Sequence, residues 1–333
     1  MSSPLLSIVV PTYNRRRILT RTLPSYLGQK GVDGRYEVIV VVDGSTDGTL
    51  SMLQRTDRAT RLRIISQPNG GLAAARNRGA AAARGEILLF LDDDMVAAAD
   101  LVAIHLEEQG TSSQRVVLGA LGLAEGVRRS FLKEGVATWS RDMERRLSAP
   151  GYRPRFDDWS FGHASISRTL FLDLEGFDER FVSYGNEDYD LGWRLTHRGV
   201  EVRFAARAVA RQIYEKSFAA WLRDVYFVGR ADVVLAEKYP SIAADLRLSR
   251  REAHPLKRLA RWSGLASVDP LAPGWMTVAG TLTLAERLSL RGSPLSHTQS
   301  LIGERAYWRG VRDARFRGVP AEAGAMNRPG RAA

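Results

Sequence analysis

The sequence contains no cysteine among its 333 residues. This absence excludes a disulfide scaffold, a thiolate metal site and a cysteine nucleophile. Long apolar runs are absent as well: the longest, such as Ile87–Leu91, fall far short of the ~20 residues that a membrane-spanning helix needs. Lysine is scarce, since 43 of the 48 basic residues are arginine.

Acidic residues are scarce in the last quarter of the chain. The formal net charge is +11, and residues 247–333 contain 15 basic and 6 acidic residues, a balance of 15 − 6 = +9. Such a region can meet anionic lipid, nucleic acid or an acidic glycan, and it is equally typical of a solvated arginine-rich surface. The N-terminus lacks the features of a signal peptide. We therefore expect a cytoplasmic protein whose basic segment 247–261 contacts the inner face of the membrane peripherally.

Short apolar runs and helical patterns alternate through the first hundred residues. Continuous apolar strands separated by helices indicate a parallel sheet covered on both faces. In such sheets, ligands bind beyond the carboxyl ends of the strands. We expect strands at residues 5–11, 36–42, 62–66 and 86–91, and helices at 16–29, 49–55 and 72–84.

The rest of the chain is less regular. We expect strands at 115–123, 161–167 and 200–205, helices at 101–109, 131–147, 187–198 and 218–239, and partly helical segments after residue 247. The predicted organisation is one domain with two halves, a basic helical extension and a disordered tail. These parts cover residues 1–245 (halves 1–100 and 101–217), 246–320 and 321–333.

Three adjacent carboxylates, Asp92, Asp93 and Asp94, follow the fourth predicted strand. Because they repel one another, they are most easily maintained around a cation. Asp92 and Asp94 project to the same side of an extended chain and can hold a hard cation such as Mg²⁺ or Mn²⁺. The alternative is a solvated turn or a helix N-terminus capped by carboxylates.

Polar residues also follow the first two strands. Tyr13, after the first strand, can stack on a base, and Asp43, after the second, can accept the imino N–H of a pyrimidine. The alternative for Tyr13 is a turn with a core aromatic. The alternative for Asp43 is an ordinary strand-to-helix turn in which Asp43 or Ser45 caps the next helix. Arg76, on the alanine-rich helix, can reach a phosphate or a base, although an arginine on a helix surface is more often solvated.

A third acidic group, Glu187, Asp188 and Asp190, lies at a predicted helix start. Carboxylates there satisfy free N–H groups and the helix dipole, or one of them faces a substrate as general base. Tyr184 and Trp193 nearby can form a platform for a sugar ring or pack in the core.

Together these segments resemble the family-2 glycosyltransferases with the GT-A fold. The resemblance covers roughly residues 5–217, and the tail RAYWRGVRDA (305–314) is similar to tails of some members. It implies an α/β fold with a mostly parallel central sheet flanked by helices, in which residues 1–100 are the nucleotide-binding half and residues 101–217 the acceptor half. The segments that carry the resemblance are SIVVPTYNR, VIVVVDGSTDGT, QPNGGLAAARNRGAAAARGEILLFLDDDM and GFDERFVSYGNEDYDLGWRLTHRG.

The resemblance also implies roles for single residues. Asp94, with Asp92, would bind a divalent metal, Mn²⁺ or Mg²⁺, that bridges the diphosphate of a nucleotide sugar. Asp188 would be the catalytic base, with Glu187 orienting it or contacting the acceptor. The nucleotide-binding residues would be Pro11, Thr12, Tyr13, Asn14, Asp43, Arg76, Asp92 and Asp93.

The sequence departs from the family pattern at one place. Many members carry a histidine after the last core strand, near the metal or diphosphate, whereas here Gln212 or Arg211 would take its place. His163 stands where other members often carry a small or amide residue. We expect His163, Tyr184 and Trp193 to line the acceptor pocket; the alternative for His163 is a structural histidine whose hydrogen bonds are satisfied within the fold.

The predicted function is transfer of a sugar, with inversion, from a UDP- or dTDP-sugar to a hydroxyl of a glycan, a lipid-linked glycan or a small molecule. The enzyme alternatives are a retaining sugar transferase or a nucleotidyltransferase, neither of which needs Asp188 as base. The non-enzyme alternative is a sugar-binding protein. A nucleic-acid-binding protein is disfavoured, because three acidic clusters at strand ends would repel the phosphate backbone. A dehydrogenase is disfavoured, because no G-x-G-x-x-G follows the first strand.

Overall fold

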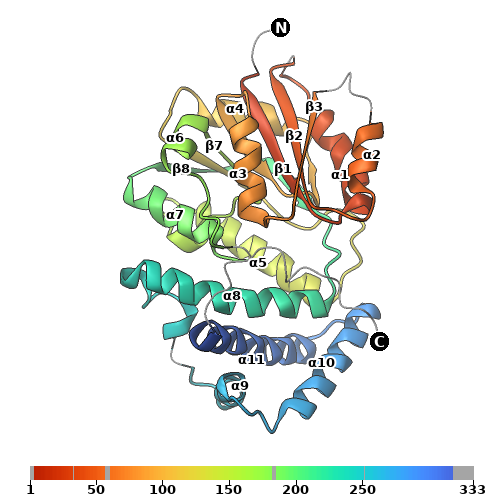
Figure 1. Ribbon diagram of the computed structural model, residues 1–333, viewed down its shortest axis with the longest axis vertical. Coiled ribbons are helices and arrows are strands. Elements are labelled where there is room, and N and C mark those ends of the chain that lie inside the picture. Colours follow the sequence, from red (N-terminus) through yellow and green to blue (C-terminus); the bar gives the residue numbers. More distant parts are fainter. Residues whose placement is uncertain (1–3, 33, 57–60, 182–184, 251, 318–333) are drawn as a thin grey trace.

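The computed structural model describes residues 4–32, 34–56, 61–181, 185–250 and 252–317. The predicted tail at 321–333 lies outside these ranges. An eight-stranded mixed sheet forms the centre of the fold, with strand order β3-β2-β1-β4-β7-β6-β8-β5 (Figure 1). The strands are β1 (Leu6–Thr12), β2 (Tyr36–Asp43), β3 (Leu62–Gln67), β4 (Ile87–Leu91), β5 (Met95–Ala97), β6 (Arg115–Ala120), β7 (His163–Ser167) and β8 (Glu201–Gln212).

The first four strands run parallel, as predicted. Every residue of β1 and β2 is buried, because helices cover both faces of the sheet. Apolar side chains of α1 and α4 pack on one face, and those of α3, α6 and α7 pack on the other. These helices and the short α2 are α1 (Arg16–Leu27), α2 (Thr49–Arg55), α3 (Leu72–Ala82), α4 (Leu101–Gln109), α6 (Arg168–Asp173) and α7 (Glu187–His197).

The other half of the sheet is mixed. Strand β7 is antiparallel to both β4 and β6, while β8 is parallel to β6 and antiparallel to β5. The predicted strand at 200–205 continues to Gln212, past a register shift in its partner between Gly119 and Ala120. This extension was missed because arginines interrupt its apolar residues, and β5 was missed because it has only three residues.

Four helices form a layer beyond the carboxyl ends of the strands, with α5 (Phe131–Leu147) between it and the sheet (Figure 1). The C-terminal helical extension is thus confirmed. The layer includes α8, which packs on α11, so it begins before the predicted boundary at residue 245. Its helices are α8 (Phe218–Lys238), α9 (Pro255–Leu265), α10 (Ala272–Arg287) and α11 (Ser293–Arg317), with 3-10 turns at Phe156–Asp158, Pro240–Ile242 and Arg247–Ser249.

Two glycines allow α8 and α11 to cross closely. A Cβ on Gly229 would lie 2.1 Å from the carbonyl oxygen of Tyr307, and one on Gly310 would lie 1.9 Å from that of Tyr226. Both distances are far below van der Waals contact, so each position requires glycine. The RAYWRG motif therefore forms the crossing of these two helices. Within the described ranges, no helix combines the length and apolarity needed to traverse a bilayer.

Candidate active site

Side chains of α1 fix the backbone of residues 92–94, which follow β4 and which we call the acidic turn. The Tyr26 hydroxyl donates to the carbonyl oxygens of Asp92 (2.9 Å) and Met95 (2.6 Å). The Thr22 hydroxyl donates to the carbonyl oxygen of Asp93 (2.7 Å). Because the backbone of the turn is fixed on this side, its three carboxylates project in set directions at the edge of the sheet.

Asp93 and Asp94 have different partners. Asp93 accepts the Thr12 hydroxyl at 2.7 Å, and Asp94 accepts Nε2 of Gln212 at 3.2 Å. Arg15 is the nearest cation, 3.8 Å from Asp93 and 3.6 Å from Asp94. Burial raises the pKa of Asp93 to about 6, and burial together with the neighbouring carboxylates raises the pKa of Asp94 to about 7. The buried negative charge of this turn is therefore only partly compensated.

Gln212, rather than Arg211, lies at the acidic turn. The Arg211 guanidinium instead donates to the carbonyl oxygen of Leu121 at 2.6 Å. Gln212 is the last residue of β8, and the backbone N–H of Ile213 donates to the carbonyl oxygen of Asp94 at 2.8 Å. Among the described residues, no three His, Asp or Glu side chains converge to ligate one ion.

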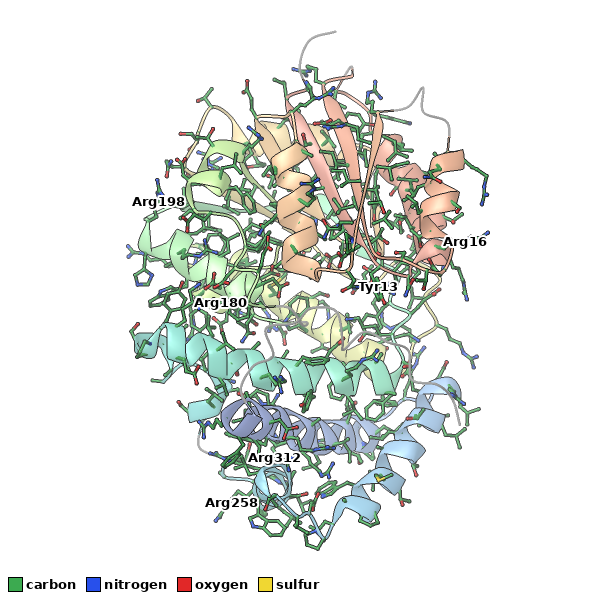
Figure 2. All side chains as sticks on the ribbon, in the orientation of Figure 1. Tyr13, Arg16, Arg180, Arg198, Arg258 and Arg312 are labelled. Carbon is green, nitrogen blue, oxygen red and sulfur yellow. The ribbon has the colours of Figure 1, made fainter. Side chains whose placement is uncertain are left out.

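The loops after β1 and β2 are joined by Asn14, which adopts a left-handed conformation (φ 52°). Its N–H donates to Ser45 Oγ (2.9 Å), and its side-chain oxygen accepts the N–H of Thr46 (2.7 Å). Pro11 is buried within β1. Tyr13 is partly exposed and lies at the end of the sheet that faces the helical layer (Figure 2).

Asp43 anchors the glycine loop before α3. One carboxylate oxygen accepts the N–H of Gly70 (2.8 Å) and Nε2 of Gln67 (2.8 Å), and the other accepts the N–H of Gly71 (2.9 Å). A carboxylate can accept about four hydrogen bonds. Asp43 therefore retains the capacity to accept one more donor, although the residue is largely buried.

Arg76 is buried and joins the two acidic groups of the site. Its guanidinium donates to Asp188 (2.9 Å), Glu187 (3.2 Å) and Asp92 (3.0 Å), and the residue is 2% exposed. Arg76 therefore lies between the two acidic groups, and its place beside the nucleotide stays a prediction. Its burial is not evident from the sequence, because the carboxylates of α7 come close to α3 only in the folded chain.

The two carboxylates at the start of α7 are buried around this single cation. Burial and the neighbouring Asp188 raise the pKa of Glu187 to about 7, and burial raises the pKa of Asp188 although Arg76 opposes the shift. The second oxygen of Asp188 accepts the N–H of Phe161 at 3.0 Å. Both oxygens of Asp188 are thus held in place, and its side chain remains 20% exposed.

The helical layer holds the residue before these carboxylates. Asn186 is left-handed (φ 68°), and its side chain donates to Asp232 of α8 at 2.6 Å. The Tyr307 hydroxyl of α11 donates to the other oxygen of Asp232 at 2.5 Å. Sequence reasoning missed this buried network, for which the available signals were an aspartate within an apolar helix and the tyrosine of the RAYWRG motif.

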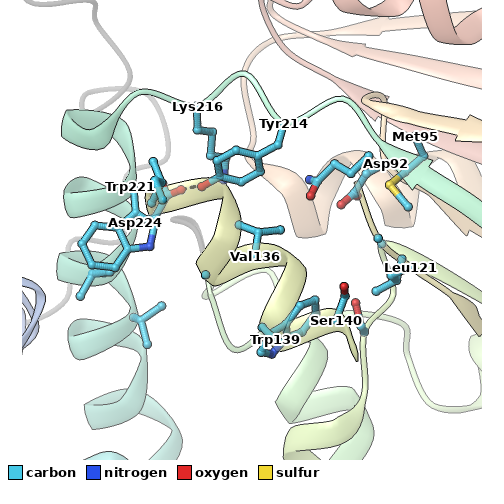
Figure 3. Close-up of a pocket in the computed structure, with 18 of the residues that line it drawn as sticks. Asp92, Met95, Leu121, Val136, Trp139, Ser140, Tyr214, Lys216, Trp221 and Asp224 are labelled. Atoms are coloured by element: carbon cyan, nitrogen blue, oxygen red, sulfur yellow. Dashed lines mark hydrogen bonds and ion pairs between the residues drawn. The ribbon is translucent and has the colours of Figure 1, made fainter. Parts of the chain in front are cut away.

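A cavity of about 630 Å³ lies between the edge of the sheet and helices α5, α8 and α11 (Figure 3). Asp92, Gly162 and Gln212 line one part of it. Aromatic side chains from separate elements line other parts of the wall, together with a Lys216–Asp224 ion pair (2.6 Å). The sequence did not identify these aromatic residues, which are Trp139, Tyr214 and Trp221.

Two predicted acceptor residues do not line this cavity. His163 is 1% exposed, with Nε2 3.1 Å from Nε2 of His105, and burial lowers its pKa to about 4. Trp193 packs against Phe156 and Tyr239 in a separate apolar cluster. Their predicted role is therefore corrected: both are packing residues. The third, Tyr184, lies outside the described residues.

Comparisons with known proteins identify the family of the chain. The model of "Glycosyl transferase family 2" matches residues 7–171, and that of the "N-terminal domain of galactosyltransferase" matches residues 141–216. The uncharacterized glycosyltransferase YfnE of Bacillus subtilis is 30% identical over 290 residues, 73% of each chain. The validoxylamine A glucosyltransferase of Streptomyces hygroscopicus is 32% identical over 222 residues, 59% of this chain and 49% of that one. The chain thus spans about half the length of that second relative.

A solved structure shows the same fold. The mannosyltransferase PcManGT from Pyrobaculum calidifontis, in complex with GDP-Man and Mn²⁺, superposes with a TM-score of 0.59 and 19% identity, covering 92% of this chain and 87% of that one. The GT-A architecture expected from the sequence is thereby confirmed. With the family model, YfnE and this fold in agreement, the chain belongs to glycosyl transferase family 2 and is a glycosyltransferase.

Proposed function

We propose that this enzyme transfers a hexose from a UDP- or dTDP-sugar to an acceptor hydroxyl with inversion of the anomeric carbon. One observation carries the proposal: Arg76 ties Asp92 of the acidic turn to Asp188 and Glu187 at the start of α7. Asp92 lines the cavity, and Asp188 accepts the N–H of Phe161, whose two neighbours in the chain line it. Inverting glycosyl transfer can use both groups, one where the diphosphate departs and one where the acceptor attacks.

The acidic turn suits a divalent cation. Its donors are all oxygens, and the buried Asp94 carboxylate is 3.6 Å from Arg15, too far for full compensation. Mg²⁺ and Mn²⁺ take one or two carboxylates and complete their shell with water and substrate phosphates. Asp94 and Asp92 would hold the ion, with the Gln212 amide as a further donor if it turns its oxygen inward. When bound, the ion supplies positive charge that stabilises the departing diphosphate.

Asp188 is the proposed general base. It would accept the proton of the acceptor hydroxyl while the new C1–O bond forms and the bond from C1 to the diphosphate oxygen breaks. Arg76 and the N–H of Phe161 hold its two oxygens, and Ser160 and Gly162, on either side of Phe161, line the cavity. The raised pKa of Asp188 makes the carboxylate a stronger base than an exposed aspartate. Glu187 would share the Arg76 charge and orient its neighbour.

Asp43 is the proposed contact to the nucleobase. Its remaining acceptor capacity suits the imino N–H that uracil and thymine share, and Tyr13 is placed to stack on the base. Thr12 and Asp93 would act indirectly, since the Thr12 hydroxyl donates a hydrogen bond to the Asp93 carboxylate and the pair shapes the loop. PcManGT is complexed with GDP-Man, so a guanine donor is the alternative that an experiment must include.

The cavity is the proposed acceptor site. Trp139, Tyr214 and Trp221 offer flat apolar faces, on which a sugar ring or the apolar part of an acceptor can pack. A glycan, a lipid-linked glycan and a small hydroxylated molecule all share the required nucleophile, a single hydroxyl directed at C1.

The test is a transfer assay with UDP-, dTDP- and GDP-hexoses and a panel of nitrophenyl glycosides as surrogate acceptors. Released nucleoside diphosphate is measured with Mn²⁺ and with EDTA, and proton NMR gives the anomeric configuration of the product. We expect an inverted product from one pyrimidine donor, formed only with metal. A retained product would contradict the role of Asp188. Release of pyrophosphate from a nucleoside triphosphate would instead assign a nucleotidyltransferase.

A further inference from the structure

The exposed apolar side chains of this protein gather in one region. Of the twelve large apolar residues that are exposed in the described ranges, nine lie between residues 256 and 290, on α9, on α10 and in the connections beside them. Figure 1 shows α9 and the connection to α10 at the end of the molecule opposite the N-terminus. Soluble proteins rarely leave such residues together in solvent unless they bind something.

Helix α9 presents one apolar flank to solvent. Leu256, Leu259 and Trp262, spaced three residues apart, are 51%, 42% and 52% exposed. The other flank packs on α11, where a Cβ on Gly264 would lie 2.6 Å from the carbonyl oxygen of Arg305. The exposed flank therefore has no partner within the described part of the chain, although the helix itself is firmly seated.

Helix α10, which follows along the chain, also leaves apolar side chains in solvent. Residues 271–285 contain no charged side chain, although α10 lies at the periphery of the helical layer (Figure 1). Met276 is 72% exposed and Leu284, two turns later, is 57% exposed. In the connection between α9 and α10, Val268 is 82% exposed. We call these three residues, with Leu256, Leu259 and Trp262, the apolar face.

The charge around the apolar face has one sign. All five carboxylates of residues 247–317 are within ion-pair distance of a basic side chain, so little negative charge remains there. The pairs are Glu252–Lys257 (3.8 Å), Asp269–Arg305 (2.5 Å), Glu286–Lys133 (3.1 Å), Glu304–Arg247 (2.5 Å) and Asp313–Arg312 (2.8 Å).

Exposed arginines supply the positive charge. Arg258 of α9 and Arg287 at the end of α10 are exposed, and neither makes an ion pair with any residue that the structure describes. Figure 2 shows Arg258 at the same end of the molecule. In contrast, Arg247 and Arg261 of the predicted basic segment stack on Tyr307 and Trp308. Arg247 and Arg261 therefore pack against aromatic side chains of α11, whereas Arg258 and Arg287 are exposed to solvent.

We propose that the apolar face docks the enzyme on the surface of an anionic lipid bilayer. A helix with apolar side chains on one flank and arginines beside them lies in the plane of the headgroups, and tryptophan favours this interface. Anionic headgroups complement Arg258 and Arg287. A second copy of this chain is the less suitable occupant, because a two-fold interface would place the same arginines against each other. The proposal does not depend on the donor, acceptor or base proposed above.

The test uses the full chain and vesicles of phosphatidylcholine, alone or mixed with phosphatidylglycerol, in a co-sedimentation assay. We expect binding to the mixed vesicles that weakens with salt, and little binding to phosphatidylcholine alone. The double variant Leu259→Ser/Trp262→Ser should lower the partition coefficient at least ten-fold, an order-of-magnitude expectation for two buried apolar groups. Arg258→Gln should lower binding to mixed vesicles about five-fold.

Leu172→Ser is the matched control, because Leu172 on α6 is 41% exposed, as Leu259 is 42% exposed. It should bind vesicles like the unaltered protein. All variants should keep their melting temperature, since the altered side chains are already in solvent. Absence of binding to anionic vesicles, or equal binding by the double variant, would overturn the proposal. A dimer in sedimentation velocity that the double variant dissociates would also overturn it and assign the face to a second copy.

Discussion

Replacement of Asp188 by asparagine tests the proposed base. Each oxygen of Asp188 accepts one hydrogen bond, from Arg76 at 2.9 Å and from the N–H of Phe161 at 3.0 Å. Asparagine has one oxygen and one NH₂ group, so in either orientation the NH₂ faces a donor. Asp188→Asn therefore removes the base and leaves one hydrogen bond unmade, with little change in volume.

The expected loss of turnover follows from the role of the group. General base catalysis contributes about 10²–10⁴-fold, which corresponds to about 2.7–5.4 kcal/mol of transition-state stabilisation. The unmade hydrogen bond adds a stability cost of about 1–3 kcal/mol. The affinity for the nucleotide should change little, because Asp43, the proposed contact to the nucleobase, belongs to a different loop.

The assay is release of nucleoside diphosphate at saturating donor, with the melting temperature measured in parallel to confirm folding. Asp173→Asn is the control, because the side chain of Asp173 is 53% exposed and its nearest cation, Arg198, is 3.9 Å away. It should keep full turnover. If Asp188→Asn folds and turns over within a few-fold of the unaltered enzyme, Asp188 is not the base and an inverting mechanism through it is refuted.

Three further predictions concern the supports of the site. Tyr307→Phe removes the hydroxyl that Asp232 accepts and should lower kcat about ten-fold with unchanged nucleotide affinity; unchanged kcat in steady-state assays would show that α11 does not position the base. Burial lowers the pKa of His163 to about 4 and that of His105 well below its ordinary value, so both are neutral in the fold. Burial of the neutral rings costs no proton release above pH ~6.5, the pKa of an unfolded histidine. As the pH falls from there to 4, His163 lowers the free energy of unfolding by about 3 kcal/mol. Urea titrations should therefore show a flatter pH dependence for His163→Gln; the same slope as the unaltered chain would contradict the assignment. Gly310→Ala should separate α8 from α11 and lower the melting temperature by several degrees, whereas Gly280→Ala, with open space around its Cβ, should be neutral or stabilising; equal effects in thermal melts would rule out the close crossing.

The parts of the fold that the sequence predicts well depend on local patterns. The first four strands are short, largely apolar segments, and the helices between them show either an apolar face, as at residues 16–27, or a run of alanines, as at residues 72–82, so their type and order followed directly. The three-residue β5 and the second half of β8 were missed, because their pairing comes from the turn at the edge of the sheet. Element boundaries there are set by tertiary hydrogen bonds rather than by composition.

The site was predictable in its carboxylates but not in its partners. The acidic groups at Asp92 and Asp188 stand out in the sequence, since each has several carboxylates close together at the end of a strand or the start of a helix. Arg76, by contrast, looks like a solvated helix residue, and only the folded chain buries it. The aromatic wall of the cavity was equally hidden, because Trp139 and Trp221 lie on different helices, 82 residues apart in the sequence.

The helical layer contributes to the site as well as covering it. The chain of hydrogen bonds from Tyr307 through Asp232 to Asn186 links α11 to the residue that precedes Glu187. Loss of these contacts would leave the sheet intact and the base less well oriented. We therefore expect a chain truncated after β8 to lose more of its transfer activity than of its affinity for the nucleotide.

The measurement that tests the central claim most directly is a thermal-shift panel with UDP, dTDP, GDP and CDP, each with Mn²⁺ and with EDTA, on the unaltered enzyme and on Asp94→Asn. A ligand at ~100 times its Kd adds about 2.7 kcal/mol of stability, which moves the midpoint by several degrees. We predict such a shift for UDP or dTDP with Mn²⁺, lost in EDTA and in Asp94→Asn. No shift with any diphosphate, or an equal shift without metal and in the variant, would contradict a metal-assisted nucleotide site at the acidic turn.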